Sequence, residues 1–346
     1  MMILPLAIAG IVATAFCFTA WKAKAIEIAF PNTGELIDVG GFSMNSLHVP
    51  KPTGADLPAI VFIHGASGNF RDQEAAFRKA LEGRAEMLFV DRPGHGYSER
   101  GGPENGFPDG QAAAIARLME KRGIDKAIIS GHSFGGAIAA SFALYHPEKT
   151  AGLLFLAPAT HPWPGRIDWY YNLTARPVIG RLFSHLLTLP AGLVVMKTAT
   201  RSVFHPNPCP ETYLRDGAPY LVLRPKVFRS NAIDVANLNG YVTRVAPRYS
   251  EITAPTVIIT GDSDAIVAEE IHSRGLADDI AGSELVSIRN LGHKPDYVAT
   301  DVVLAAIEKL AGLPRDLKAA ARIAEARIAS AAEDSAPEMD LSIEKT

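Results

Sequence analysis

The sequence has few cysteines and little net charge. Its 346 residues contain only two cysteines, Cys17 and Cys209, which are too few for a disulfide framework. Neither cysteine has a neighbouring ligand at metal-site spacing, so we expect no metal site. The formal net charge of −3 gives no basis for a concentrated basic surface. We therefore expect no nucleic-acid partner.

The N-terminal run from Met2 to Trp21 carries no charged side chain. A helix of this length would be about 30 Å long, the thickness of the hydrocarbon core of a bilayer. We interpret residues 2–21 as a single-pass membrane anchor. Lys22 and Lys24 follow the run, which favours a cytoplasmic position for the rest of the chain. The alternative is a cleaved signal, with an exported mature form that starts near Ala25.

The rest of the chain alternates strand patterns with helical patterns. This rhythm indicates an α/β fold, with a mostly parallel central sheet flanked by helices. The expected strands are 58–64, 85–90, 126–130, 153–157, 256–260 and 284–288, with a hairpin formed by shorter strands at 25–30 and 41–49. The expected helices are 72–82, 111–122, 136–145, 268–276 and 301–310.

The alternation stops between residues 161 and 248, where prolines, aromatics and arginines accompany helical patches such as 168–188. We interpret this region as an inserted helical cap. Its apolar segment Leu186–Met196 is either ordinary core or a substrate-entry surface on the bilayer, and we favour the second interpretation. The predicted organisation is an anchor or signal at 1–24, core at 25–160, cap at 161–248, core at 249–313, and a charged tail at 314–346 that is helical to 332 and then disordered.

The segment 131–136, GHSFGG, has the form Gly-x-Ser-x-Gly between a strand pattern and a helical pattern. This context is typical of a nucleophile elbow, a sharp turn that raises a serine hydroxyl above a sheet. Glycines flank the serine because side chains there would clash across the turn. Ser133 is therefore the candidate nucleophile.

A serine hydroxyl needs a neighbouring base, and the base needs a group that orients it. His293 follows the last predicted strand and is the candidate base. Asp262 and Asp264 both follow the strand at 256–260. We favour Asp264, because its position further along the loop lets it reach the imidazole. The order serine, acid, histidine is the one that this architecture uses.

These motifs together resemble the α/β-hydrolase superfamily, in particular the branch with a helical cap inserted before the acid. The resemblance covers about residues 25–312 and rests on His64-Gly65, Asp91–Ser98 (DRPGHGYS), 131–136, Gly261–Asp264 and Gly292-His293. It implies an oxyanion hole formed by the backbone N–H groups of Ala66 and Phe134. Such donors stabilise the charge that develops in the transition state.

Three other histidines lie in these motifs, namely His64, His95 and His132. We expect each to bond loop backbone rather than to react, because buried polar side chains commonly serve that purpose. Asp91 and Arg92 are expected to organise their own loop.

The sequence thus predicts a membrane-anchored serine hydrolase that cleaves an ester, or a related acyl bond, of a small apolar substrate without a metal or organic cofactor. Serine at the elbow argues against the haloalkane dehalogenases and epoxide hydrolases of this fold, which use a carboxylate nucleophile. Carbon–carbon bond hydrolysis and cofactor-free haloperoxidase chemistry use the same three residues and remain alternatives. A catalytically idle binding module is the alternative from another class. The sequence leaves the specific substrate and the oligomeric state open.

Overall fold

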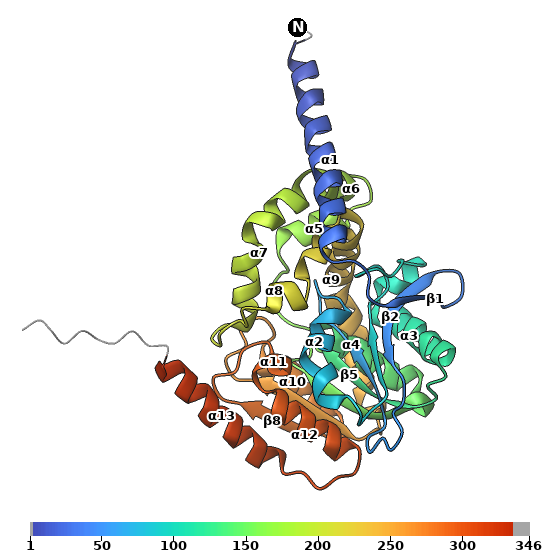
Figure 1. Cartoon of the computed structure of the whole chain (residues 1–346), viewed down its shortest axis with the longest axis vertical. Coiled ribbons are helices and arrows are strands. Elements are labelled where there is room, and N and C mark those ends of the chain that lie inside the picture. The colour runs from blue at the N-terminus through green and yellow to red at the C-terminus, as the bar shows by residue number, and fades with distance from the viewer. Residues whose placement is uncertain (1–2, 335–346) are drawn as a thin grey trace, which may run out of the picture.

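The structure is a computed structural model that describes residues 3–334. A central sheet lies beneath a group of helices, and one long N-terminal helix extends away from that group (Figure 1). The C-terminal helix lies at the opposite end of the molecule, beneath the sheet. The fold therefore has a core, a cap and a projecting helix.

The described residues form one eight-stranded sheet with the order β1-β2-β4-β3-β5-β6-β7-β8. The first two pairings, β1 with β2 and β2 with β4, are antiparallel, and all the others are parallel. The strands are β1 Glu35–Asp38, β2 Ser43–Val49, β3 Ala59–Ile63, β4 Met87–Val90, β5 Ala127–His132, β6 Thr150–Leu156, β7 Thr256–Gly261 and β8 Glu284–Ile288. The predicted α/β fold with a mostly parallel sheet is confirmed.

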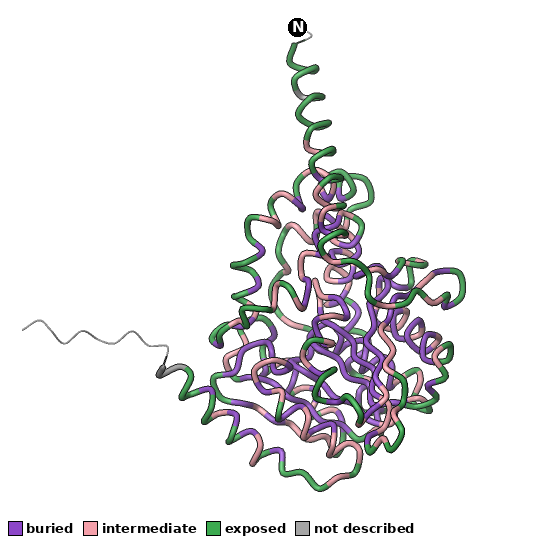
Figure 2. Tube along the Cα trace, in the orientation of Figure 1, coloured by how far each residue is buried: buried purple, intermediate pink, exposed green. Residues whose placement is uncertain are grey.

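Helices cover both faces of the sheet, so its inner strands are apolar on both sides. The core helices are α2 Phe70–Leu81, α3 Pro108–Arg122, α4 Phe134–Tyr145, α10 Glu269–Asp279, α11 Pro295–Val298, α12 Thr300–Leu310 and α13 Leu317–Asp334. One buried cluster joins Val61 and Ile63 of β3 to α3, α4 and α10. A second joins Ile60 and Phe62 to α2, α12 and α13. Figure 2 shows this buried interior in the lower half of the molecule.

The strand predicted at 25–30 is wrong. These residues end the long helix α1, Ile3–Ala29, and the first hairpin instead joins β1 to β2. No glycine or proline interrupts the chain between Ala15 and Phe30, and Ile26 is buried on the face of the helix that contacts the cap. Helical continuity and this packing outweigh the short alternating pattern. The predicted boundary at 24/25 lies inside α1.

Helices alone fill the region between β6 and β7 in the described structure, in agreement with the helical character predicted for 161–248. The predicted single patch at 168–188 is divided, because Pro177 interrupts it. The elements are α5 Trp169–Ala175, α6 Ile179–Phe183, η3 Ser184–Thr188, α7 Leu189–Phe204, α8 Tyr213–Asp216, η4 Pro219–Leu223, α9 Pro225–Val245 and η5 Ala246–Glu251.

Two described helical segments are long and apolar enough to cross a membrane, Ile3–Ala29 and Ile179–Phe204. Their most apolar windows have mean hydropathies of 2.2 and 1.5, and 6% and 28% of these windows are buried. A signal sequence and a buried helix of a soluble protein meet the same criterion. At the other end of the chain, α13 agrees with the predicted helix, whereas the disorder predicted after residue 332 falls mainly outside the described residues.

Candidate active site

Ser133 lies at the sharp junction between β5 and α4. Its φ of 53° and ψ of −118° fall in a strained region that the surrounding turn must enforce. A Cβ at Gly131 would lie 2.3 Å from the carbonyl oxygen of Gly135, and one at Gly135 would lie 2.3 Å from that of Ile63. These distances explain why the turn requires glycine on both sides of the serine.

His293 and Asp264 meet on the loops that follow β8 and β7. Nδ1 of His293 lies 2.6 Å from Oδ2 of Asp264, and both side chains are buried. The other oxygen of Asp264 accepts hydrogen bonds from the backbone N–H groups of Ile266 and Val267 at 2.8 and 3.0 Å. A carboxylate at Nδ1 holds the proton there, which leaves Nε2 as an acceptor.

Asp262, the other acid considered, points elsewhere. Its Oδ1 accepts hydrogen bonds from the backbone N–H of Asn290 and the hydroxyl of Ser263, at 2.8 and 2.9 Å. Asp262 thus braces the loop after β8, and of the two acids Asp264 is the one that contacts His293.

Ser133 and His293 line the same cavity. In the described part of the chain, neither Ser133 Oγ nor His293 Nε2 has a hydrogen-bond partner. The direct bond that a proton transfer between them requires is therefore not formed in this state. Catalytic hydrogen bonds of unliganded enzymes are often long and tighten when substrate binds.

The loop after β3 approaches Ser133 closely. A Cβ at Gly65 would lie 3.0 Å from that of Ser133, so the next residue, Ala66, lies beside the elbow. Neither Ala66 N–H nor Phe134 N–H donates a hydrogen bond within the described structure. Both predicted oxyanion donors are thus available to a ligand.

Asn231 of α9 holds this loop. Its Oδ1 accepts a hydrogen bond from Ser67 N–H at 2.7 Å, and its Nδ2 donates to Ser67 Oγ at 3.0 Å. Ser67 has a φ of 58°, so this pair of bonds stabilises a conformation that serine rarely adopts. The sequence pattern did not identify Asn231, because no motif spacing links a cap residue to this loop.

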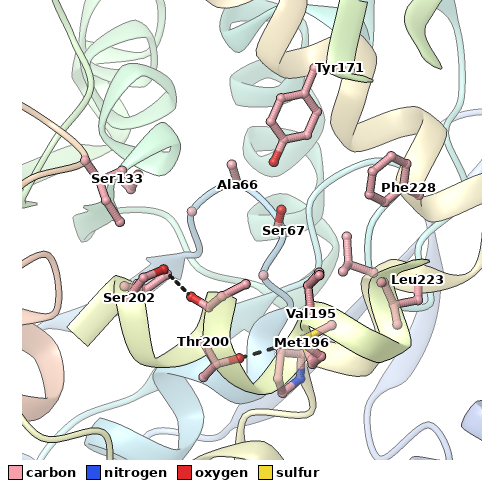
Figure 3. A pocket seen from close by; sticks show the side chains of 18 of the residues that line it. Ala66, Ser67, Ser133, Tyr171, Val195, Met196, Thr200, Ser202, Leu223 and Phe228 are labelled. Atoms are coloured by element: carbon pink, nitrogen blue, oxygen red, sulfur yellow. Dashed lines mark hydrogen bonds between the residues drawn. The ribbon is translucent and has the colours of Figure 1, made fainter. Parts of the chain in front are cut away.

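The cavity has a volume of about 710 Å³ and lies between core and cap. Its core side includes Ser133, His293 and the 65–68 loop, and its cap side consists mainly of apolar and aromatic side chains. Figure 3 shows Ser133 and the Ala66–Ser67 loop facing the same space as Tyr171, Val195 and Phe228. The site is suited to an apolar molecule that reaches a polar corner.

We compared the sequence with models of known protein families. The family described as the α/β hydrolase fold matches residues 58–296, which covers the elbow, Asp264 and His293. The chain belongs to the α/β-hydrolase family. The predicted resemblance is confirmed, and the chain is a hydrolase.

The hydrolase is similar in sequence to two named enzymes and in fold to a solved structure. It is 28% identical over 271 residues to a 2-hydroxy-6-oxononadienedioate/2-hydroxy-6-oxononatrienedioate hydrolase of Klebsiella pneumoniae, covering 77% of this chain and 90% of the relative. It is 24% identical over 238 residues to a monoacylglycerol lipase of Xenopus laevis, covering 68% and 69%. The crystal structure of an enol-lactonase from Burkholderia xenovorans matches with a TM-score of 0.63 and 17% identity, covering 80% and 99%, and shows the shared fold.

His64, His95 and His132, the three other histidines of the motifs, bond protein groups, as expected. Burial, with Arg92 contributing, holds the pKa of His64 well below its usual range, and burial does the same for His95 and His132. His132 Nε2 donates to the carbonyl oxygen of His293 at 2.9 Å. Neutral His132 therefore fixes the backbone of the candidate base.

Asp91 and Arg92 organise their loop as expected. Asp91 accepts hydrogen bonds from Phe70 N–H and Tyr97 N–H, both at 2.8 Å. Arg92 is fully buried and pairs at 3.0 Å with Asp234 of α9, which is also fully buried. This ion pair joins core to cap, and the sequence pattern did not identify Asp234.

A buried cluster lies behind His293. Asp72, His132 and Asp296 offer metal-ligand atoms within 4.8 Å of one another. Lys294 Nζ already lies 2.9 Å from a carboxylate oxygen of each aspartate. Burial alone would lower the pKa of Lys294, but Asp296 and Asp72 outweigh it and raise that pKa. The cluster thus contains its own cation, which lines the cavity.

Proposed function

We propose that the hydrolase cleaves an ester, or a related acyl bond, of an apolar substrate through Ser133, His293 and Asp264. The observation that carries the proposal is the strained elbow serine, which shares an apolar cavity with a histidine already paired to an aspartate. This arrangement supplies a nucleophile, a base and an orienting group in one place.

The reaction would proceed in two halves. Ser133 Oγ attacks the carbonyl carbon while His293 Nε2 takes its proton, and the resulting oxyanion accepts hydrogen bonds from Ala66 N–H and Phe134 N–H. Collapse of this intermediate breaks the ester C–O bond, and the leaving alcohol receives the proton from His293. Water then attacks the acyl-enzyme with the same base, which releases the acid and restores the serine hydroxyl.

The cavity favours a neutral substrate. Among the described residues that line it, Lys294 is the only lysine or arginine, and it is already paired with Asp72 and Asp296. A carboxylate placed in this cavity would have no free cation, which is unfavourable in an apolar site. Neutral acyl esters, the substrate class in the name of the monoacylglycerol lipase relative, therefore fit better than dicarboxylates.

Carbon–carbon bond hydrolysis is the second candidate, because the Klebsiella relative carries that kind of name. Assays of the full-length enzyme with a monoacylglycerol and with a dienedioate distinguish the two. We expect turnover of the first only, lost by about 10³-fold or more in Ser133→Ala. Ser202→Ala is the matched control, because Ser202 also lines the cavity but bonds only the carbonyl oxygen of Ala199. Turnover of the dienedioate alone would replace the ester proposal with the second candidate.

We also propose that α1 anchors the hydrolase in a membrane. The apolar window of α1 is 6% buried, and its C-terminal part contributes Ile26 to a buried cluster of the cap. Removal of a signal near Ala25 would cut through this helix. Extraction of membranes with alkaline carbonate should leave the full-length chain in the pellet, and release of a shortened chain would support the export alternative.

A further inference from the structure

Charge is divided unevenly between cap and core. Residues 161–248 contain 11 Lys and Arg against 4 Asp and Glu, a net charge of +7, whereas the rest of the chain contains 23 against 33, a net charge of −10. The overall balance of −3 conceals this division. Arg176, Arg181, Lys197 and Arg201 are exposed, and the cap's ion pairs in the described structure use other basic residues. The cap therefore presents free positive charge to its surroundings.

Large apolar side chains are exposed on the same helices. The exposed fractions are 79% for Val178, 60% for Ile179 and 52% for Leu182 around α6, and 82% for Val194 on α7. Single exposed apolar residues are ordinary, but a group of them surrounded by charged residues marks a contact surface. Figure 2 shows exposed stretches along α6 and α7, in the half of the molecule from which α1 projects.

The cavity reaches this surface. Trp169 of α5, Leu187 of η3 and Val195 of α7 line the cavity and have exposed fractions of 68%, 54% and 53%. The route to Ser133 therefore begins among the apolar residues of the cap surface.

The helix α1 packs on this part of the cap. Its buried and half-buried residues include Ala15, Thr19, Ala23 and Ile26, which recur at helical spacing and form one stripe. The ring of Phe16 stacks on His185 of η3 with ring centroids 5.0 Å apart. The anchor and the cap surface thus lie side by side.

This packing sets the depth of the cap. If residues 2–21 span the hydrocarbon core, Phe16 lies about 8 Å inside the boundary marked by Trp21, at a rise of 1.5 Å per residue. The η3 segment that stacks on Phe16 must lie at a similar depth. Amphipathic elements bound at a membrane interface are immersed by about 5–10 Å, so α6 and η3 would lie where exposed apolar residues are stable.

From these observations we infer that the cap is a second membrane contact, which inserts α6, η3 and the exposed face of α7 into an anionic leaflet and opens the cavity to that leaflet. The exposed arginines and lysine would bind lipid phosphates, each contributing attraction near the surface. A second copy of the chain is the less favourable occupant, because two caps of net charge +7 repel each other. The inference rests on the proposed anchoring by α1 and is independent of the chemistry proposed for Ser133.

The test uses the full-length chain in vesicles of phosphatidylcholine, with or without phosphatidylglycerol. The two native cysteines are first removed by Cys17→Ala and Cys209→Ala. An environment-sensitive fluorophore is then attached to a single new cysteine on the cap, at Leu182→Cys or at Val194→Cys. The control position is Glu148→Cys, which lies outside the cap and is exposed to solvent. We expect a blue shift at the two cap positions and quenching by nitroxide lipids, most strongly with phosphatidylglycerol, and no response at the control.

A charge-reversal pair tests the anionic component. Arg176→Glu with Arg181→Glu should remove about half or more of the phosphatidylglycerol-dependent gain, whereas Lys318→Glu with Arg322→Glu, on exposed α13 positions, should leave it intact. Cap probes that respond like the control in vesicle-bound protein would overturn the inference. A fluorescence response at the cap positions that grows with the protein-to-lipid ratio would also overturn the inference, because it would indicate that a second copy of the chain covers the cap surface. Vesicle flotation measures membrane binding through α1, and fluorophosphonate labelling measures the reactivity of Ser133. Failure of either earlier proposal can therefore be distinguished from failure of the cap to contact the membrane.

Discussion

At the scale of single residues, Asp264 and Asp262 form a matched pair of acids on one loop. Asp264→Asn should lower kcat/KM on a short acyl ester by about 10²- to 10⁴-fold, because the amide cannot hold His293 in the required tautomer. Asp262→Asn should retain most activity, since Asp262 bonds Asn290 N–H and Ser263 rather than His293. Steady-state kinetics of both variants would contradict the assignment if Asp262→Asn were the more damaging change.

Asn231 allows a test of the loop that carries Ala66. Its two bonds to Ser67 position a backbone donor rather than the substrate. Asn231→Ala should therefore lower kcat by about 10-fold or more and change KM little. Asn231→Asp, which keeps the acceptor for Ser67 N–H, should recover part of kcat. Loss confined to KM would instead indicate that Asn231 contacts substrate.

Asp296 gives a prediction for the pH dependence of stability. Burial raises the pKa of its carboxyl to about 6, above the value of about 3.9 for an unfolded aspartate. The folded state then binds this proton more tightly, so ionisation of Asp296 lowers the free energy of unfolding as the pH rises from about 4 to about 6.

Asp296→Asn removes that titration. The free energy of unfolding of the variant minus that of wild type should be highest at pH 7. This difference should decrease by roughly 1 kcal/mol for each pH unit as the pH is lowered from 6 to 4. Urea unfolding at these pH values measures the difference. A difference that stays constant, or grows as the pH falls, would contradict a raised pKa.

At the scale of elements, α1 is part of the cap as well as the proposed anchor. Ile26, 7% exposed, packs with Leu189 and Leu223 of the cap, whereas Ile28 on the same helix is 72% exposed. Ile26→Asp should lower the free energy of unfolding by about 2–4 kcal/mol because it buries an unpaired charge. Ile28→Asp should have little effect. Thermal unfolding in detergent compares the two, and equal losses would show that the packing of Ile26 contributes little.

The core elements were predictable because each one follows a local rule. The apolar runs that form β3, β5 and β7 are buried along nearly their whole length, as inner strands covered on both faces should be. Gly123 ends α3 in the left-handed conformation expected for a stop. The strand predicted at 25–30 is wrong because an alternating pattern of six residues is weaker than the continuity of a helix that packs on a distant cap.

At the scale of the whole molecule, the sequence indicates Ser133, Asp264 and His293 as candidate site residues but does not indicate the side chains that hold the loops around them. Asn231 and Asp234 lie in the cap, far from the core motifs in sequence, and only tertiary packing brings them to Ser67 and Arg92. Lys294 directly follows His293 in the sequence, yet its pairing with Asp72 depends on the position of α2. Contacts of this kind have no local signature, so they had to be seen in three dimensions.

The proposed hydrolysis requires Ser133 to be an activated nucleophile in a cavity shared by core and cap. Treatment of the full-length hydrolase with a fluorophosphonate, followed by peptide mass spectrometry, tests this claim most directly. We expect one adduct, on the peptide that contains Ser133, and no adduct in Ser133→Ala. An adduct at another serine, or labelling that survives in Ser133→Ala, would contradict it.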